Sequence, residues 1–316
     1  MSSRCGLGTR CANKERLVKK TLLLGAVAYD PKVVPIWDII RDYANAGDFG
    51  IGLDYVLFSN YERQVDSLLK GHIDVAWNTN VAWIRTLHAT NNAARALIMR
   101  DTDIDFTTKF VALKDSGIQT LVDLKGKRFG LGSRDSAQAA IMGLYYLQQA
   151  KIVPEITEFH SPDECGRGRS DEIRAAELKV VRHNSDLGKH GDTGRSEFDV
   201  LDSIKRGELD AGAIGSSTWI RILQEGSYPE IASFWSSPGY CHCNFSVLPS
   251  FDFGLGETFA QMLLSQNERK DDPMISKMMS MEGLNKWVRV GEEQLRGYDA
   301  IYTAMREQNL LENASL

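Results

Sequence analysis

The chain has 316 residues, of which 43% are hydrophobic and 25% are charged, and its formal net charge is −5. This length is more than one hydrophobic core usually supports, so we expect a globular protein with two lobes. Because the chain has no basic excess to hold a polyanion, its composition argues against a nucleic-acid partner.

The N-terminal residues 1–20 are basic, but no apolar stretch precedes Lys19 and Lys20. A secretory signal requires such a stretch, so we expect no signal and, for the sequence as written, a cytosolic product. We expect residues 1–20 to be disordered or flexible. The apolar run Leu22–Ala28 is too short to cross a bilayer and predicts a buried strand.

Strand-like and helix-like segments then alternate as far as about residue 220. The predicted strands lie at 21–29, 51–58, 73–77, 110–114, 128–132, 177–183 and 209–214. The predicted helices lie at about 33–46, 60–70, 136–150 and 196–206. This alternation predicts an α/β fold of βαβ units in which each lobe is a mostly parallel sheet flanked by helices.

The last third of the chain is predicted to be helical and amphipathic, and it needs an apolar surface to cover, so we expect it to return to the first lobe. The polar stretch 114–127 contains glycines, which is typical of a connecting segment, so we expect the chain to cross there from the first lobe into the second. We therefore assign 21–112 plus 224–316 to lobe 1 and 113–223 to lobe 2. Segment 155–189 is the least periodic and is expected to be a surface insertion.

An internal repeat relates the two predicted lobes. Residues 68–87 align without a gap with residues 204–223, and six of the twenty positions are identical. In each copy a helix ends at a glycine, Gly71 or Gly207, and a short strand and a polar turn follow. Because ligands bind beyond the carboxyl ends of parallel strands, the turns Asn78–Thr79–Asn80 and Gly215–Ser217, including Ser216, are expected to face each other across a cleft.

A second turn has the composition of an anion site. The strand at 128–132 is followed by Ser133, Arg134, Asp135 and Ser136 and then by a long helix for which Ser136 is a plausible N-cap. Such a turn directs backbone N–H groups and the positive end of the helix dipole into the crevice, and serine hydroxyls complete a site for phosphate, phosphonate or sulfonate. Asp135 is expected to face away from an anion or to cap the helix.

Several segments together make residues 20–311 resemble a known family. They are "LLKGHIDVAWNTNVAWI", "LVDLKGKRFGLGSRDSAQAAIMGLYYL", "GKHGDTGRSEFDVLDSIKRGELDAGAI", "CHCNFSVLPS" and the tail from "DDPMISKMMSMEGLNKWV" to "YDAIYTAMREQNLL". The chain is similar to the type II periplasmic-binding-protein fold, and specifically to the phosphonate/phosphite/phosphate-binding components of ABC transporters.

The resemblance implies a solute-binding protein that closes two lobes over a small anion, without a cofactor, as a monomer that serves an ABC permease in the periplasm. It implies that Ser133, Ser136 and His190 hold the anion from lobe 2. It also implies that Phe58 or Tyr61 closes over the ligand from lobe 1, together with Asn78–Asn80. Relatives that bind aminophosphonates carry a carboxylate where this chain has Gly215, so an aminophosphonate is disfavoured.

An alternative is a cytosolic enzyme or ligand sensor on the same fold, such as a relative of the thiamine-precursor synthases. We expect no enzyme, because the sequence lacks a phosphate-binding P-loop, a complete dinucleotide motif and a nucleophile elbow. The five cysteines fit reduced thiols. Cys241 and Cys243 flank His242, but no second Cys/His cluster completes a ligand set, so no metal is expected; an extended C-x-C pair would place both thiols on one face.

Overall fold

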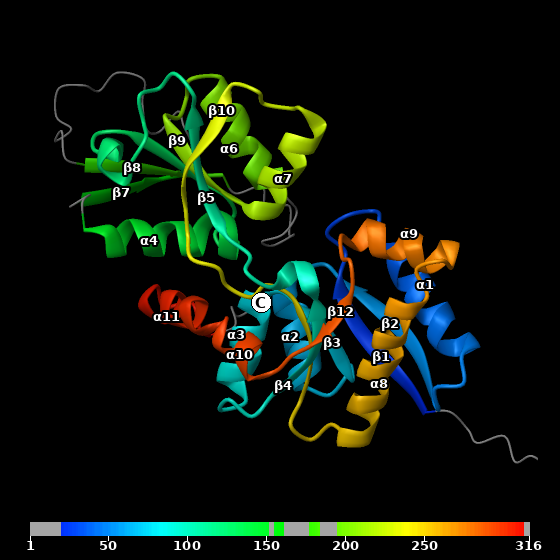
Figure 1. Cartoon of the computed structure of the whole chain (residues 1–316). Coiled ribbons are helices and arrows are strands. Elements are labelled where there is room, and N and C mark those ends of the chain that lie inside the picture. The colour runs from blue at the N-terminus through cyan, green and yellow to red at the C-terminus, as the bar shows by residue number, and fades with distance from the viewer. Residues whose placement is uncertain (1–19, 152–154, 161–176, 184–194, 313–316) are drawn as a thin grey trace, which may run out of the picture.

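The computed structural model describes residues 20–151, 155–160, 177–183 and 195–312, which form two α/β lobes (Figure 1). Residues 1–19 and His190, for which the sequence made predictions, lie outside the described part. None of the described helices is both long and apolar enough to span a bilayer. The predicted two-lobed architecture is confirmed.

Lobe 1 is a six-stranded sheet with the order β12-β4-β11-β3-β1-β2, in which β11 and β12 run against the other four strands. Its strands are β1 (Lys20–Val27), β2 (Ile51–Phe58), β3 (Val75–Asn78), β4 (Arg95–Arg100), β11 (Asn244–Val247) and β12 (Trp287–Arg289). Its helices are α1 (Val33–Ala46), α2 (Tyr61–Leu69), α3 (Asn80–Ala89), α8 (Phe253–Ser265), α9 (Pro273–Glu282), α10 (Glu292–Arg296) and α11 (Asp299–Glu307), with short turns η1 (Asp101–Asp103) and η4 (Gln266–Glu268).

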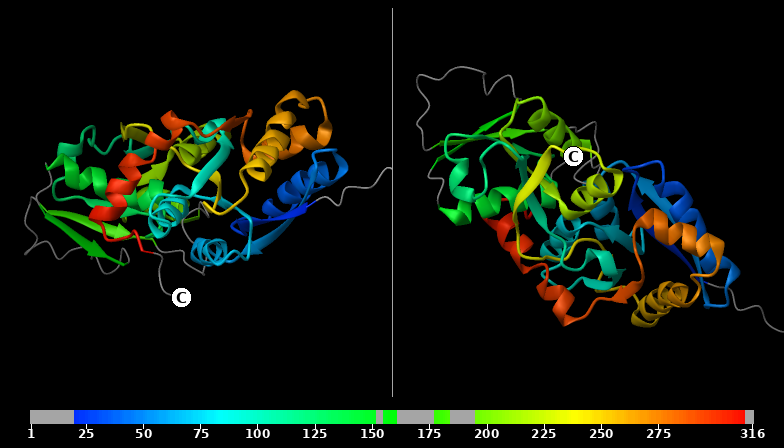
Figure 2. Two further views of the ribbon diagram at one scale, coloured as in Figure 1. Left: turned by 90° about the horizontal axis from the view of Figure 1, so that it is seen from below. Right: turned by 45° about the horizontal axis from the view of Figure 1, so that its top comes forward.

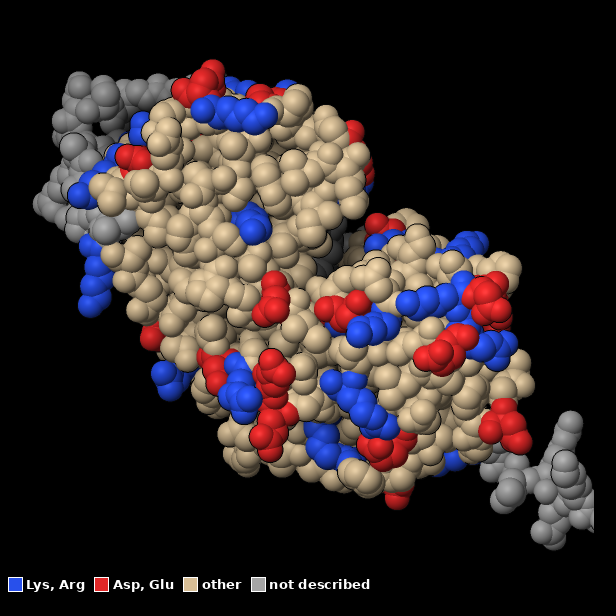
Figure 3. Space-filling view, in the orientation of Figure 1, with Lys and Arg blue, Asp and Glu red and all other residues tan. Residues whose placement is uncertain are grey.

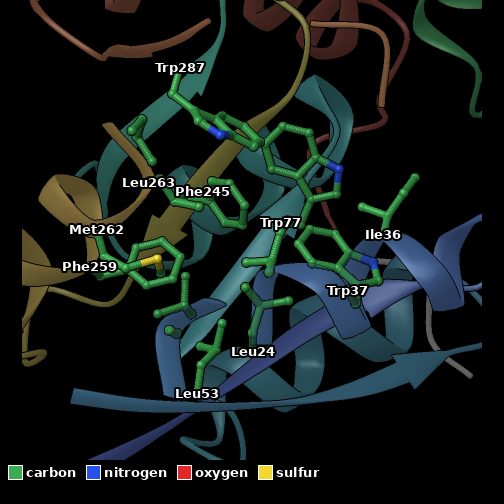
Figure 4. Close-up of a cluster of buried hydrophobic side chains, with 14 of the residues drawn as sticks. Leu24, Ile36, Trp37, Leu53, Trp77, Phe245, Phe259, Met262, Leu263 and Trp287 are labelled. Atoms are coloured by element: carbon green, nitrogen blue, oxygen red, sulfur yellow. The ribbon is translucent and has the colours of Figure 1, made fainter. Parts of the chain in front are cut away.

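Strand β1 is apolar on both sides because both faces of the sheet are covered. Leu22 and Leu24 pack into the large cluster under α1, α8 and α9, whereas Leu23 packs on the opposite side near α2. The large cluster surrounds Trp77 and Phe245, whose ring centroids lie 4.5 Å apart (Figure 4). A strand that is buried on both faces needs apolar residues at successive positions. This explains the continuous hydrophobic run from Leu22 onward.

Lobe 2 is a second six-stranded sheet with the order β10-β5-β9-β6-β8-β7. Its strands are β5 (Thr108–Leu113), β6 (Arg128–Leu131), β7 (Glu155–Phe159), β8 (Glu177–Arg182), β9 (Ala211–Gly215) and β10 (Ile231–Ser236). Its helical elements are η2 (Leu121–Leu124), η3 (Ala137–Ile141), α4 (Met142–Ala150), α6 (Arg195–Lys205) and α7 (Ser216–Glu225). Part of the expected insertion is therefore regular structure, because β7 pairs in parallel with β8 at the edge of the sheet.

The lobes are joined by two short crossing segments, residues 101–107 and 237–243. They touch at Phe106 and Tyr240, whose backbones exchange hydrogen bonds of 2.8 and 2.9 Å. Lobe 2 thus extends from β5 to β10, which is wider than the boundaries of 113 and 223 drawn from the sequence. The reason is that the polar stretch 114–127 connects β5 to β6 inside lobe 2, whereas the true crossings are shorter and contain several buried residues.

The aspartate that the two copies of the sequence repeat share makes the same backbone contact in both lobes. The Oδ2 atom of Asp74, just before β3, accepts the backbone N–H of Leu23 at 2.8 Å. In the same way, Asp210 Oδ2 accepts the backbone N–H of Arg128 at 2.8 Å. Gly71 and Gly207 share a φ of +70°, the left-handed conformation that favours glycine after a helix. Each copy therefore fastens a central strand to its parallel neighbour.

The C-terminal region only partly follows the prediction that it returns to lobe 1. Helices α8 and α9 cover lobe 1, but α11 packs against α3 of lobe 1 and also against η3 and α4 of lobe 2 (Figures 1 and 2). The side chain of Gln308, at its end, donates a hydrogen bond to the carbonyl oxygen of Ile141 at 2.9 Å. The last helix therefore contacts both lobes beside the crossing segments.

We predict that Asp210→Ala lowers the free energy of unfolding by about 1–3 kcal/mol, because it removes the acceptor of the partly buried N–H of Arg128 and the ion pair between the two side chains. Burial raises the pKa of Asp210, but hydrogen bonds from Arg128 outweigh burial, and the net pKa is lowered. Its stabilising contribution is thus present above the ordinary pKa of an aspartate and is lost as the pH falls. Urea unfolding should show a difference from wild type that shrinks toward pH 3. An equal difference at both pH values, or an equal loss in the exposed Asp271→Ala control, would contradict this account.

Candidate functional site

Several helices begin at the edge where the parallel strands of the two lobes end. In lobe 1, α2 and α3 start directly after β2 and β3; in lobe 2, η3 and α7 start after β6 and β9. The surface is hollowed between the lobes, and acidic and basic side chains are interspersed on the face shown in Figure 3. Helix N-termini at the carboxyl ends of strands present N–H donors and a positive dipole end, which suits an anion.

The turn after β6 contains an unsatisfied hydroxyl. Ser133 is only 3% exposed, and its Oγ atom is buried without a hydrogen-bond partner. Its backbone carbonyl accepts the N–H of Ser136 at 2.9 Å, which closes the turn. A buried hydroxyl without a partner is costly unless a ligand or water satisfies it, so Ser133 has the property expected of a ligand-binding group.

Ser136 is the N-cap, as the sequence predicted, and not Asp135. Its Oγ atom accepts the backbone N–H of Ala139 at 3.2 Å. The helix that follows begins with one turn of π-helix, η3, in which the carbonyl of Ser136 accepts the N–H groups of both Ala140 and Ile141. Such turns occur frequently at functional sites. Arg134 is exposed and Asp135 is half-buried, so Ser133 and Ser136 are the two buried residues of the turn.

The predicted lobe 1 turn has its amides engaged inside the protein. Asn78 is fully buried and donates to Ser246 Oγ at 2.7 Å, while its Oδ1 atom accepts from Gln64. Asn80 donates to the carbonyl oxygen of Cys241 at 3.2 Å, and Thr79 caps α3. These contacts fix the turn and engage both asparagine amides within the protein.

The other predicted residues also lie at the ends of strands. Phe58 is half-buried at the end of β2, and Tyr61, 5% exposed, packs with it at the start of α2. Ser216 starts α7, and its backbone and hydroxyl exchange hydrogen bonds with the backbone of Thr107, at 2.8 and 3.2 Å. Of the candidates that the structure describes, Ser133, Ser136 and Ser216 lie in lobe 2, and Phe58, Tyr61 and Asn78–Asn80 lie in lobe 1.

Next to this turn lies a buried polar network that the sequence analysis missed. Gln138 Nε2 donates to Glu197 Oε1 at 3.1 Å, and Glu197 Oε2 accepts the N–H of Gly215 at 2.8 Å. Gly215 has no room for a side chain, because a Cβ atom would lie 2.7 Å from Cγ of Gln138. No sequence pattern distinguishes the buried Glu197 from the other charged residues of α6, which are exposed or partly exposed, so only the three-dimensional contacts reveal this group.

The network continues into the crossing segments. His242 is stacked on Phe106 with ring centroids 4.6 Å apart, and its Nε2 atom lies 3.3 Å from Gln138 Oε1. Its Nδ1 atom lies 3.0 Å from Cys243 Sγ and 3.5 Å from Asp103 Oδ1.

Arg100 holds both oxygens of the Asp103 carboxylate, at 2.6 and 2.7 Å, and also contacts Glu282. Burial alone would raise the pKa of Asp103, but Arg100 and His242 lower it to about 2. Asp103 therefore stays charged inside the protein over the physiological pH range.

Asp103, His242 and Cys243 bring three possible metal-ligand atoms within 4.8 Å of one another. They are better described as hydrogen-bonding groups. Both oxygens of Asp103 are occupied by Arg100, and burial raises the pKa of the Cys243 thiol to about 11, so the thiol stays protonated. Cys241 packs in a different hydrophobic cluster from Cys243, so the expectation that the two thiols share one face is wrong.

We predict that replacing each of the two serines of the turn by alanine changes the free energy of unfolding differently. Ser136→Ala should lower the free energy of unfolding by about 1 kcal/mol through loss of the N-cap. Ser133→Ala should leave the stability of the ligand-free protein unchanged or raise it, because it removes a hydroxyl that has no partner. Urea unfolding in phosphate-free buffer tests both, and a comparable loss in the two variants would contradict the assignment.

We also predict how the free energy of unfolding depends on acidic pH. The depressed pKa of Asp103 means that its charged form favours the fold, so its contribution is complete above an ordinary pKa near 4 and is lost as the pH falls toward 2. Asp103→Asn should cost about 2 kcal/mol or more at pH 7, because Arg100 loses the carboxylate that holds it by two hydrogen bonds, and much less at pH 2.5. Unfolding experiments across this range would reveal it, with Asp271→Asn as the matched exposed control.

Comparisons with known proteins agree with this architecture. The family model for the phosphonate periplasmic substrate-binding protein of ABC transporters matches residues 29–290. A probable ABC transporter phosphite-binding protein, PhnD1 of Prochlorococcus marinus (strain MIT 9301), is 22% identical over 261 residues, which cover 79% of this chain and 78% of PhnD1.

Two solved structures share the fold. The structure of PhnD1 from Prochlorococcus marinus in complex with methylphosphonate has a TM-score of 0.65 at 18% identity and covers 92% of this chain and 99% of its own. XAC2383 from Xanthomonas citri, bound to ATP, has a TM-score of 0.70 at 15% identity and covers 92% and 98%. Because the family match spans most of the chain and the turn after β6 has the chemistry of an anion site, the chain belongs to the phosphonate-binding family of ABC transporter substrate-binding proteins.

Proposed function

We propose that this protein binds a small phosphonate-like oxyanion between its two lobes and delivers it to an ABC permease. The observation that carries the proposal is the buried Ser133 hydroxyl, which has no partner and lies in the turn before a long helix. An oxyanion in the cleft would accept hydrogen bonds from this hydroxyl and from the first N–H groups of η3, which have no acceptor within the helix.

The lobe 1 side of the site would be formed by the starts of α2 and α3. The caps Asn60 and Thr79 hold these helix ends in place, at 2.9 and 3.4 Å from the N–H groups that they accept. Donors from both lobes would then surround one anion, and closure would remove water from them. We keep His190, which precedes α6, as a proposed further donor from lobe 2.

The named relatives support the chemical class. PhnD1 is described as a probable phosphite-binding protein and was solved with methylphosphonate. Both ligands are small tetrahedral anions without an ammonium group, in agreement with the expectation that an aminophosphonate is disfavoured. We propose a monomer that binds without chemical turnover, as befits a transport component.

The proposal is tested with a panel of anions. We expect phosphite, methylphosphonate or phosphate to raise the melting temperature, with little effect from sulfonates or carboxylates. Ser133→Ala should weaken binding of the best anion by about 1–3 kcal/mol in calorimetry, because one hydrogen bond to a charged ligand is lost. The exposed Ser280→Ala is the matched control. A melting temperature that no phosphorus oxyanion raises, or unchanged affinity in Ser133→Ala, would contradict the proposal.

A further inference from the structure

A continuous chain of buried side chains joins the crossing segments to the anion-binding turn. It runs from His242 to Gln138 and from Gln138 to Glu197, over distances of 3.3 and 3.1 Å, and ends at the N–H of Gly215, 2.8 Å from Glu197. The three side chains are between 2% and 5% exposed. At such burial each hydrogen bond is sheltered from water, so the direction in which each one donates is constrained.

The direction follows from Glu197. Its carboxylate accepts hydrogen bonds from the backbone of Gly215 and from Gln138, so the amide nitrogen of Gln138 must face Glu197. The amide oxygen of Gln138 then faces His242, and Nε2 of the ring must carry the hydrogen that it accepts. This holds for the neutral and for the charged ring, because the two states differ at Nδ1, the atom that faces Cys243 and Asp103.

The chain touches all the parts that would have to move together. Gln138 belongs to η3, directly after the Ser133–Ser136 turn, and Gly215 directly precedes Ser216 at the start of α7. At the other end, His242 lies in the second crossing segment and stacks on Phe106 of the first. A shift of the turn therefore changes the contact at His242, and a rotation of the crossing segments changes the position of Gln138.

We propose that His242 is a positioning residue for the anion site, which fixes the Ser133–Ser136 turn through its Nε2–H hydrogen bond to Gln138 and so couples anion binding to rotation about the crossing segments. The positioning of the turn stands on the contacts alone. The coupling to an anion rests on the proposed function. Gln138 cannot easily rearrange to compensate, because its Cγ atom already fills the space above Gly215.

Two substitutions of His242 separate this role from a merely structural one. In His242→Gln, the amide nitrogen can occupy the place of Nε2 and keep the donor to Gln138. In His242→Asn, the shorter amide reaches only the place of Nδ1, and the hydrogen bond from residue 242 to the oxygen of Gln138 is lost. Gln138→Met, which removes the acceptor at similar volume, completes a double-mutant cycle with His242→Asn.

The ligand-free protein is examined first, by hydrogen exchange measured on peptides that cover residues 133–141. His242→Asn should raise the exchange rate of this turn at least about fivefold, since a buried acceptor loses its partner, whereas His242→Gln should stay near wild type. In the Gln138→Met background, His242→Asn should add little. Equal exchange in both His242 variants, or additive effects in the cycle, would overturn the positioning role.

The same variants are then titrated with methylphosphonate by calorimetry. His242→Asn should weaken binding at least about fivefold, and His242→Gln should restore most of the affinity. If the wild type binds methylphosphonate but both His242 variants bind it equally well, the coupling is overturned. If the wild type binds no phosphorus oxyanion, the proposed function fails instead, and the exchange experiment alone decides the role of His242.

Discussion

The directional character of parallel strands is the constraint on which the binding site depends. In both lobes the parallel strands end at the same edge, and the next helix begins there with N–H groups that have no acceptor within the helix. Two such sheets are joined by short crossing segments, and in the proposed site the helix starts of both lobes line one hollow. No cluster of basic residues is then needed to attract an anion, which agrees with a net charge of −5. The affinity can come from oriented dipoles and hydroxyls.

Much of this could be predicted from the sequence because the signals are local. The alternating pattern predicted seven of the strands, and the repeat around Gly71 and Gly207 reflects a backbone conformation and an aspartate contact that both lobes share. Ser136 was recognised as an N-cap for the same reason. By contrast, the lobe boundaries were misplaced, because the crossing segments are short and buried while a longer polar connection lies inside lobe 2.

The polar network at the crossing could not be predicted from local signals. Asp103, Gln138, Glu197 and His242 come from four distant parts of the chain, and no local pattern links them to one another. Burial turns them into a set in which every donor needs a particular acceptor. The asparagines of the lobe 1 turn illustrate the converse, since side chains predicted to contact a ligand are instead hydrogen-bonded within the protein, to β11 and to the second crossing segment.

The last helix has a mechanical consequence for the motion of the lobes. Because α11 packs on α3 and on η3–α4 at once, any rotation about the crossing segments must slide these helices along it. The shared cluster contains Met99, Met142 and Met305, all fully buried. Unbranched thioether side chains can change rotamer and refill space as the contact shears. The C-terminal helix can therefore slide against its neighbours without leaving a cavity. The extent to which the two lobes can close then depends on how far these methionine side chains can repack.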